Sequence, residues 1–242
     1  MSILRVLLWM ILLPLAAFLV YLAVLFIYSF TVDMKKPIEK PSKFARKQID
    51  FVIPPFNRIC GIRLKKSGLD KLPRDQRFLV VCNHRSLFDP TTAVEALKGF
   101  DVNYISKPEN FKLPLVGPFI HAAGSLSIDR DNDRQALRDI LQAAEYIKKD
   151  FCSMCIYPEG TRSKGSELLP FHAGAFKLAQ KAGVGIAVAA VEGTEKVKSR
   201  LLRKTPVSFD VLEFIPAEKV KEMKATELAD YSRNLIMEHL NG

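Results

Sequence analysis

The stretch VVCNHRSLFDP, residues 80–90, ends an apolar run at His84 and places Asp89 five positions later. The run RFLVVCN favours a buried strand, and PTTAVEALKGF after it favours a helix. Similar apolar runs alternate with helical patterns to the end of the chain, which predicts an α/β fold with a central sheet flanked by helices. His84 and Asp89 then lie where a strand ends, a usual place for reactive residues.

The same pattern predicts the remaining elements. The expected strands are residues 77–83, 102–106, 125–129, 151–160, 185–193 and 207–215. The expected helices are residues 90–100, 113–124, 133–150, 173–183 and 225–240.

The loop between His84 and Asp89 has two interpretations. In the first, His84 is a general base and Asp89 accepts a hydrogen bond from its other ring nitrogen. In the second, His84 is a polar loop residue and Asp89 caps the helix that begins with Pro90. This stretch alone does not decide between them.

Positive charge is concentrated in one segment. The 242-residue chain, long enough for one sizeable domain and an appendage, has a net charge of +10. Residues 33–66 contain ten Lys or Arg and three Asp or Glu, which gives +7 of that total. This balance leaves nucleic acid, anionic lipid and a phosphorylated substrate open as partners.

An uncharged run, Val6 to Val32, precedes this basic segment. As a helix it would be about 40 Å long, enough to span or deeply enter a hydrocarbon core of about 30 Å. A cleaved signal peptide is the alternative. One cation, Arg5, precedes the run and six follow it before residue 48, so the rest of the chain is expected on the cytoplasmic side of a membrane.

The chain is therefore expected to have three parts. Residues 1–32 are a membrane helix, 33–66 a basic, broken amphipathic segment at the membrane interface, and 67–242 a globular domain. Pro54 and Pro55 interrupt the middle segment. In a reducing compartment Cys152 and Cys155 are expected to be small buried residues, not a metal site.

A second polar loop, YPEGTRS at 157–163, also follows an apolar run. Arginine suits a phosphate, and glycine lets backbone donors approach an anion. The alternative for this loop is a solvated turn.

Together these stretches resemble the glycerolipid acyltransferases. NHRSLFD at 83–89 is similar to their NHxxxxD signature, and YPEGTRS is similar to FPEGTRS. KPENFKLPLVGPFIHAAGSLSIDR at 107–130 resembles a third pattern, and PFHAGAFKLA at 170–179 and VEGT at 191–194 extend the likeness. Asn110, Gly185 and Val188 depart from the family pattern.

The resemblance implies transfer of a fatty acyl group from a thioester to a lysophospholipid, most directly the sn-2 hydroxyl of 1-acyl-sn-glycerol-3-phosphate. It implies His84 and Asp89 as catalytic residues. The residues implied for substrate binding are Lys107, Arg130, Glu159, Gly160, Thr161 and Arg162. The oxyanion of such a transfer also needs hydrogen-bond donors, and we expect backbone N–H groups near Gly160 to supply them.

The implied partners are the lysophospholipid, acyl-CoA or acyl carrier protein as donor, and membrane lipid, with no nucleic acid. No metal and no organic cofactor are expected. A different lysophospholipid or glycerol 3-phosphate remains possible as the acceptor. A metal-dependent phosphoesterase and a non-catalytic lipid-binding module are the remaining alternatives; the first would need more ligands than His84 and Asp89.

Overall fold

The computed structural model describes residues 3–128, 133–163 and 167–242. Its seven strands form one mixed sheet in the order β1-β7-β6-β2-β5-β3-β4. Five neighbouring strands, from β6 to β4, are parallel, and β7 runs antiparallel to β6. The strands are β1 (Ile62–Ser67), β2 (Phe78–Cys82), β3 (Val102–Ser106), β4 (Leu126–Ser127), β5 (Ser153–Ile156), β6 (Gly185–Glu192) and β7 (Thr205–Ile215).

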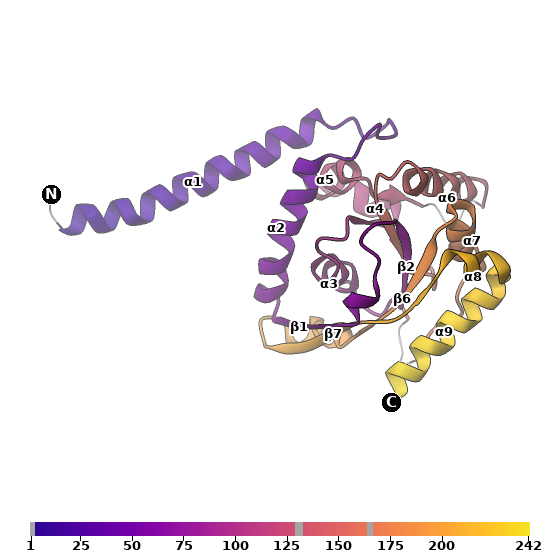
Figure 1. Ribbon diagram of the computed structural model, residues 1–242. Coiled ribbons are helices and arrows are strands. Elements are labelled where there is room, and N and C mark those ends of the chain that lie inside the picture. The colour runs from indigo at the N-terminus through magenta and orange to yellow at the C-terminus, as the bar shows by residue number, and fades with distance from the viewer. Residues whose placement is uncertain (1–2, 129–132, 164–166) are drawn as a thin grey trace.

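Helices cover both faces of the sheet, which confirms the predicted fold class (Figure 1). Leu79 and Val81 of β2 pack in a core with α6 (Asp133–Lys148), α7 (Ala173–Ala182) and α9 (Ala225–Asn241), whereas Phe78, Val80 and Cys82 pack with α3 (Asp89–Ala96). Burial on both faces explains why β2 is apolar throughout. The other helices of this region are α4 (Pro108–Phe111), α5 (Val116–Ala123) and α8 (Ala217–Glu222).

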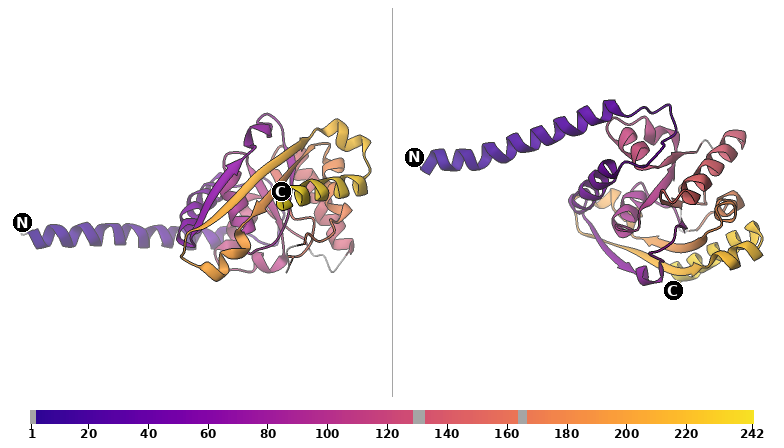
Figure 2. Two further views of the ribbon diagram at one scale, coloured as in Figure 1. Left: turned by 90° about the horizontal axis from the view of Figure 1, so that it is seen from below. Right: turned by 45° about the horizontal axis from the view of Figure 1, so that its top comes forward.

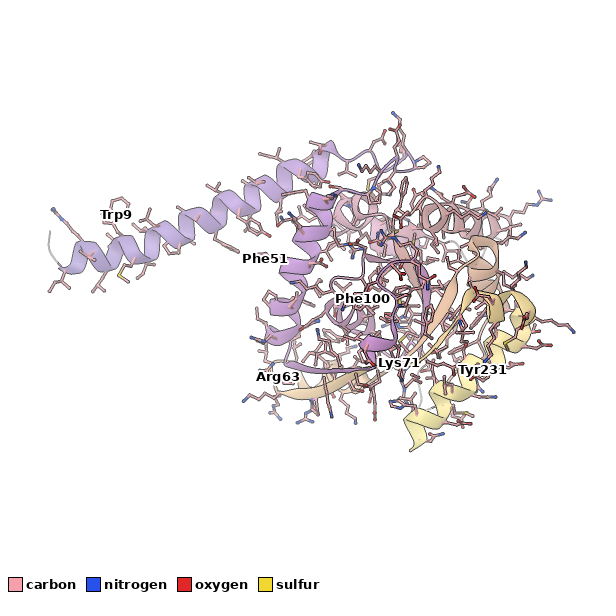
Figure 3. All side chains as sticks on the ribbon, in the orientation of Figure 1. Trp9, Phe51, Arg63, Lys71, Phe100 and Tyr231 are labelled. Atoms are coloured by element: carbon pink, nitrogen blue, oxygen red, sulfur yellow. The ribbon has the colours of Figure 1, made fainter. Side chains whose placement is uncertain are left out.

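Helix α1 (Ile3–Thr31) projects from the body, as both views of Figure 2 show. Its stretch Arg5–Thr31 is long and apolar enough to cross a membrane, with a mean hydropathy of 2.8. The end of α1 is attached to α2 (Lys43–Ile59) and α5: Tyr21 donates to Gln48, and Tyr28 donates to Ser42 at 2.8 Å. The apolar side chains of α1 before Tyr21 are mostly exposed, and Trp9 points outward in Figure 3.

The segment expected to be broken is instead a continuous helix, α2, followed by a strand. Ser42 caps α2 by accepting from the N–H of Ala45 at 3.2 Å. Pro54 has no N–H for the carbonyl of Asp50, and Lys98 Nζ donates to that oxygen instead, at 3.3 Å. Strand β1 then pairs with β7, so residues 62–66 are part of the sheet.

Most of the other expected elements are shorter than expected, but β3 has the expected bounds, and β7 and α9 extend one or two residues further. β5 ends at Ile156, before the YPEG turn, and β4 is a two-residue strand. Gly183 ends α7 in the left-handed conformation, as expected from its position. Cys152 and Cys155 are both free and buried, which confirms that they are small buried residues.

Candidate active site

Parallel strands bring the polar loops to one edge of the sheet. The loop with His84 follows β2, the loop with Glu159 follows β5, and Thr194 follows β6. Because these three strands are parallel neighbours, their carboxyl ends lie side by side. Lys107 follows β3, the next strand in the sheet. Arg130 lies outside the described residues.

Asp89 is fully buried and lies at the centre of this edge. Its Oδ2 is 2.8 Å from His84 Nδ1 and accepts from the N–H groups of Arg85 and Ser86, each at 2.7 Å. Its Oδ1 accepts a short hydrogen bond from the Thr194 hydroxyl. Four donors therefore hold one carboxylate, and they come from the loops after β2 and β6.

These contacts argue against the capping interpretation. Asp89 is the first residue of α3, Phe88 is the cap residue, and no side chain caps this helix. Three of the donors to the carboxylate belong to residues 84–86, which precede the helix, and the fourth is Thr194. Asp89 is thus bonded to the histidine, as the first interpretation requires.

The contact with Asp89 determines which nitrogen of His84 is available. A carboxylate can only accept, so the neutral ring carries its proton on Nδ1 and leaves Nε2 unprotonated. Nε2 has no hydrogen-bond partner among the described residues. The ring stacks on Tyr157 with centroids 4.5 Å apart, and 16% of the side chain is exposed.

Glu159 holds the two loops together. Its Oε1 accepts from the His84 N–H at 2.6 Å and its Oε2 accepts from the Leu169 N–H at 3.1 Å. The side chain is buried, and burial raises its pKa although these two N–H groups act in the opposite direction. The His84 carbonyl accepts from the Ser163 N–H at 2.9 Å, which joins the same loops a second time. These contacts give Glu159 a positioning role.

The remaining predicted residues lie on the surface of this edge. Thr161, Arg162 and Lys107 are exposed. Gly160 has φ +75°, and its N–H donates to the Tyr157 carbonyl at 3.1 Å, within the turn. The N–H groups of Thr161 and Arg162 have no acceptor in the described part of the chain.

Thr194 is the residue that the sequence analysis missed. It is fully buried, and besides its bond to Asp89 its carbonyl accepts from the Ser86 hydroxyl at 2.9 Å. Its place in the VEGT stretch was a signal, but nothing in that pattern pairs it with a residue 105 positions earlier.

A family model described as Acyltransferase matches residues 63–192, more than half of the chain. This chain belongs to the acyltransferase family. The match contains the loops with His84, Asp89 and Glu159 and ends two residues before Thr194, so most of the site of this acyltransferase lies within the family's shared region.

Curated relatives include the 1-acyl-sn-glycerol-3-phosphate acyltransferase of Salmonella typhimurium, 32% identical over 159 residues. That match covers 65% of this acyltransferase and 64% of the relative. The alpha form of the same enzyme from Ovis aries is 30% identical over 182 residues, 74% of this chain and 63% of the relative. The chain thus spans somewhat less than two thirds of the length of either relative.

A solved structure has the same fold. It is the 1-acyl-sn-glycerophosphate (LPA) acyltransferase PlsC of Thermotoga maritima, with a TM-score of 0.68 and 23% identity. The likeness covers 82% of this chain and 79% of the other.

Replacing Glu159 by glutamine tests its positioning role. One end of the amide is an NH₂ group, which would face either the His84 or the Leu169 N–H and leave a buried donor without an acceptor. We expect Glu159→Gln to lower the free energy of unfolding by about 1–3 kcal/mol. Thermal denaturation in detergent measures this, with the exposed Glu167→Gln as the matched control. Equal melting temperatures for the two variants would contradict the role.

Proposed function

We propose that this acyltransferase transfers a fatty acyl group from a thioester to the sn-2 hydroxyl of 1-acyl-sn-glycerol-3-phosphate, forming phosphatidic acid. The contact between His84 Nδ1 and Asp89 Oδ2, with Nε2 left available at the site edge, carries the proposal. The names of the curated relatives support this acceptor. The exposed cations Arg162 and Lys107 at the same edge support a phosphorylated one.

His84 acts as the general base. A hydroxyl is a weak nucleophile near neutral pH, so Nε2 takes its proton while the oxygen attacks the thioester carbonyl. The tetrahedral intermediate then collapses, the C–S bond breaks, and the departing sulfur takes the proton from the imidazolium. Asp89 keeps the ring in the required tautomer and stabilises its charged form. This route needs no metal and no organic cofactor.

Backbone donors near Gly160 stabilise the developing oxyanion. The Gly160 N–H is used within its turn, which leaves the N–H groups of Thr161 and Arg162 as the donors. One such donor is worth about 3 kcal/mol in other enzymes. The acyl donor is acyl-CoA or acyl carrier protein, which contributes its thiol as the leaving group.

Substitution of the histidine and the aspartate tests the proposed chemistry. We expect His84→Ala to abolish transfer and Asp89→Asn to lower kcat by at least about 100-fold, because general base catalysis contributes that much. Purified protein is incubated with acyl-CoA and a panel of lysophospholipids and glycerol 3-phosphate, and mass spectrometry identifies the products.

The controls separate the remaining functions. Activity that EDTA removes would favour a metal-dependent phosphoesterase. A lack of thioester-dependent CoA release would favour a lipid-binding module. A product from another acceptor alone would contradict the proposed substrate while leaving the acyl transfer intact.

Arg162 binds the phosphate of the acceptor in this proposal. Its guanidinium contacts a group that does not react, so Arg162→Ala should raise KM for the acceptor about tenfold or more and change kcat less. Lys107→Ala should have a weaker effect of the same kind, since an ammonium lacks the bidentate fork. Steady-state kinetics with varied acceptor decide this. A lower kcat at unchanged KM would instead show that Arg162 stabilises the transition state.

We also propose that α1 spans a membrane and that the catalytic domain faces the cytoplasm. The support is the apolar helix and the cations that follow it. All four native cysteines are buried, so a new surface cysteine is easily recognised. A membrane-impermeant maleimide should label Ile3→Cys in intact spheroplasts and Glu145→Cys only after lysis. Labelling of Glu145→Cys in intact spheroplasts would overturn the orientation.

A further inference from the structure

The connection between β6 and β7 ends in an exposed turn with two leucines. The Arg203 N–H donates to the Arg200 carbonyl at 2.8 Å, and the two residues between them are Leu201 and Leu202. Leu201 has φ −48° and ψ 136°, and Leu202 has φ +66°. This is the geometry of a type II turn, whose third position normally takes glycine or asparagine.

Leu202 is therefore in an unfavourable backbone conformation, and its side chain is largely exposed to solvent. A leucine in the left-handed region is strained, and its side chain is 72% exposed, so packing offsets little of that strain. Leu201 is 53% exposed. A strained backbone conformation at an exposed residue points to a function for that residue.

The base of the turn is firmly packed. Val197 is fully buried with Cys60, Ile62 and Val207, between the short helices η2 (Thr194–Lys196) and η3 (Lys198–Arg200). After the turn, the Thr205 N–H donates to the Gly61 carbonyl at 2.8 Å. The residues on both sides of the turn are thus held in place, and the two leucines project from this packed base.

Cations surround the leucines. Residues 194–204 contain five Lys or Arg and one acid, Glu195. All five cations are exposed: Lys196, Lys198, Arg200, Arg203 and Lys204. Apolar side chains at a tip with cations around them suit a lipid surface with anionic headgroups.

The turn lies on the side of the body from which α1 projects. Figures 1 and 2 show the β6–β7 connection on that side in every view, and the labels of Phe51 and Arg63 in Figure 3 mark the same side. The turn is next to the end of α2, because an added Cβ on Gly61 would lie 2.1 Å from the Arg203 carbonyl oxygen. Phe51 and Ile59 of α2, each 67% exposed, continue the apolar surface toward α1.

We propose that Leu201 and Leu202 form a second membrane contact, separate from α1, that enters the interface of a bilayer containing anionic lipid. The five cations bind the headgroups around the two side chains. This contact holds the active-site edge, to which the same connection belongs, against the membrane surface. The proposal does not depend on which acceptor the enzyme uses.

A single reporter at the turn tests the proposal in the full-length protein. Trp9 is the only tryptophan in the chain, so Trp9→Phe with Leu201→Trp leaves one indole at the tip. The protein is reconstituted in vesicles of dibrominated phosphatidylcholine with or without phosphatidylglycerol. We expect strong quenching and a shift of the emission to shorter wavelength, both larger with phosphatidylglycerol.

The matched control is Leu137→Trp in the same Trp9→Phe background. Leu137 is 58% exposed on α6, on the other side of the body in Figure 1. We expect no lipid quenching of this variant. Equal quenching at the two positions, or none at Leu201→Trp, would overturn the contact, and equal quenching with and without phosphatidylglycerol would overturn the role of the cations.

Leu202→Asn, added to the Leu201→Trp reporter, separates membrane binding from folding. Asparagine accepts the left-handed conformation more readily than leucine and is polar. We expect an unchanged or higher melting temperature together with a loss of quenching. A lower melting temperature would show that Leu202 supports the fold, and full quenching would show that its side chain does not enter the bilayer; each result would overturn the proposal.

Discussion

The buried carboxylate of Asp89 is the constraint on which the site depends. An isolated ionised group in a protein interior costs several kcal/mol or more, unless donors replace the lost water. Here the His84 ring, two backbone N–H groups and the Thr194 hydroxyl replace it. The loops after β2 and β6 must therefore be in place before the charge is stable, and the same arrangement fixes the histidine.

The parallel order of the strands makes this arrangement possible. Loops that follow β6, β2 and β5 meet because their strands are parallel neighbours. Asn83 joins the loop after β2 to the last residues of β6, since its amide donates to the Val191 carbonyl at 2.9 Å and accepts from the Val191 N–H at 2.8 Å. Glu159 joins the loop after β5 to the loop after β2. Polar side chains far apart in sequence thus lie together on a rigid sheet edge.

The sequence was sufficient to predict the elements that local patterns determine. Strands buried on both faces, such as β2 and β6, are continuous apolar runs, and His84 and Asp89 are close in sequence. β1 was missed because IRLKKS is half-exposed and basic, and it becomes a strand only by pairing with β7. α2 was missed because its prolines disfavour a helix, and the compensating Lys98 comes from elsewhere in the chain. Such long-range contacts leave no local signal.

The connection after β6 meets two opposite physical requirements within a few residues. At Thr194 the connection must exclude water, because the Thr194 hydroxyl is one of the four hydrogen-bond donors to the buried carboxylate of Asp89. At Leu201 and Leu202 it exposes apolar side chains. Val197, fully buried between them, separates the two ends, so changes at the turn reach Asp89 only through a packed core. The proposed membrane contact at the turn can therefore vary in strength without altering the contact between Asp89 and His84.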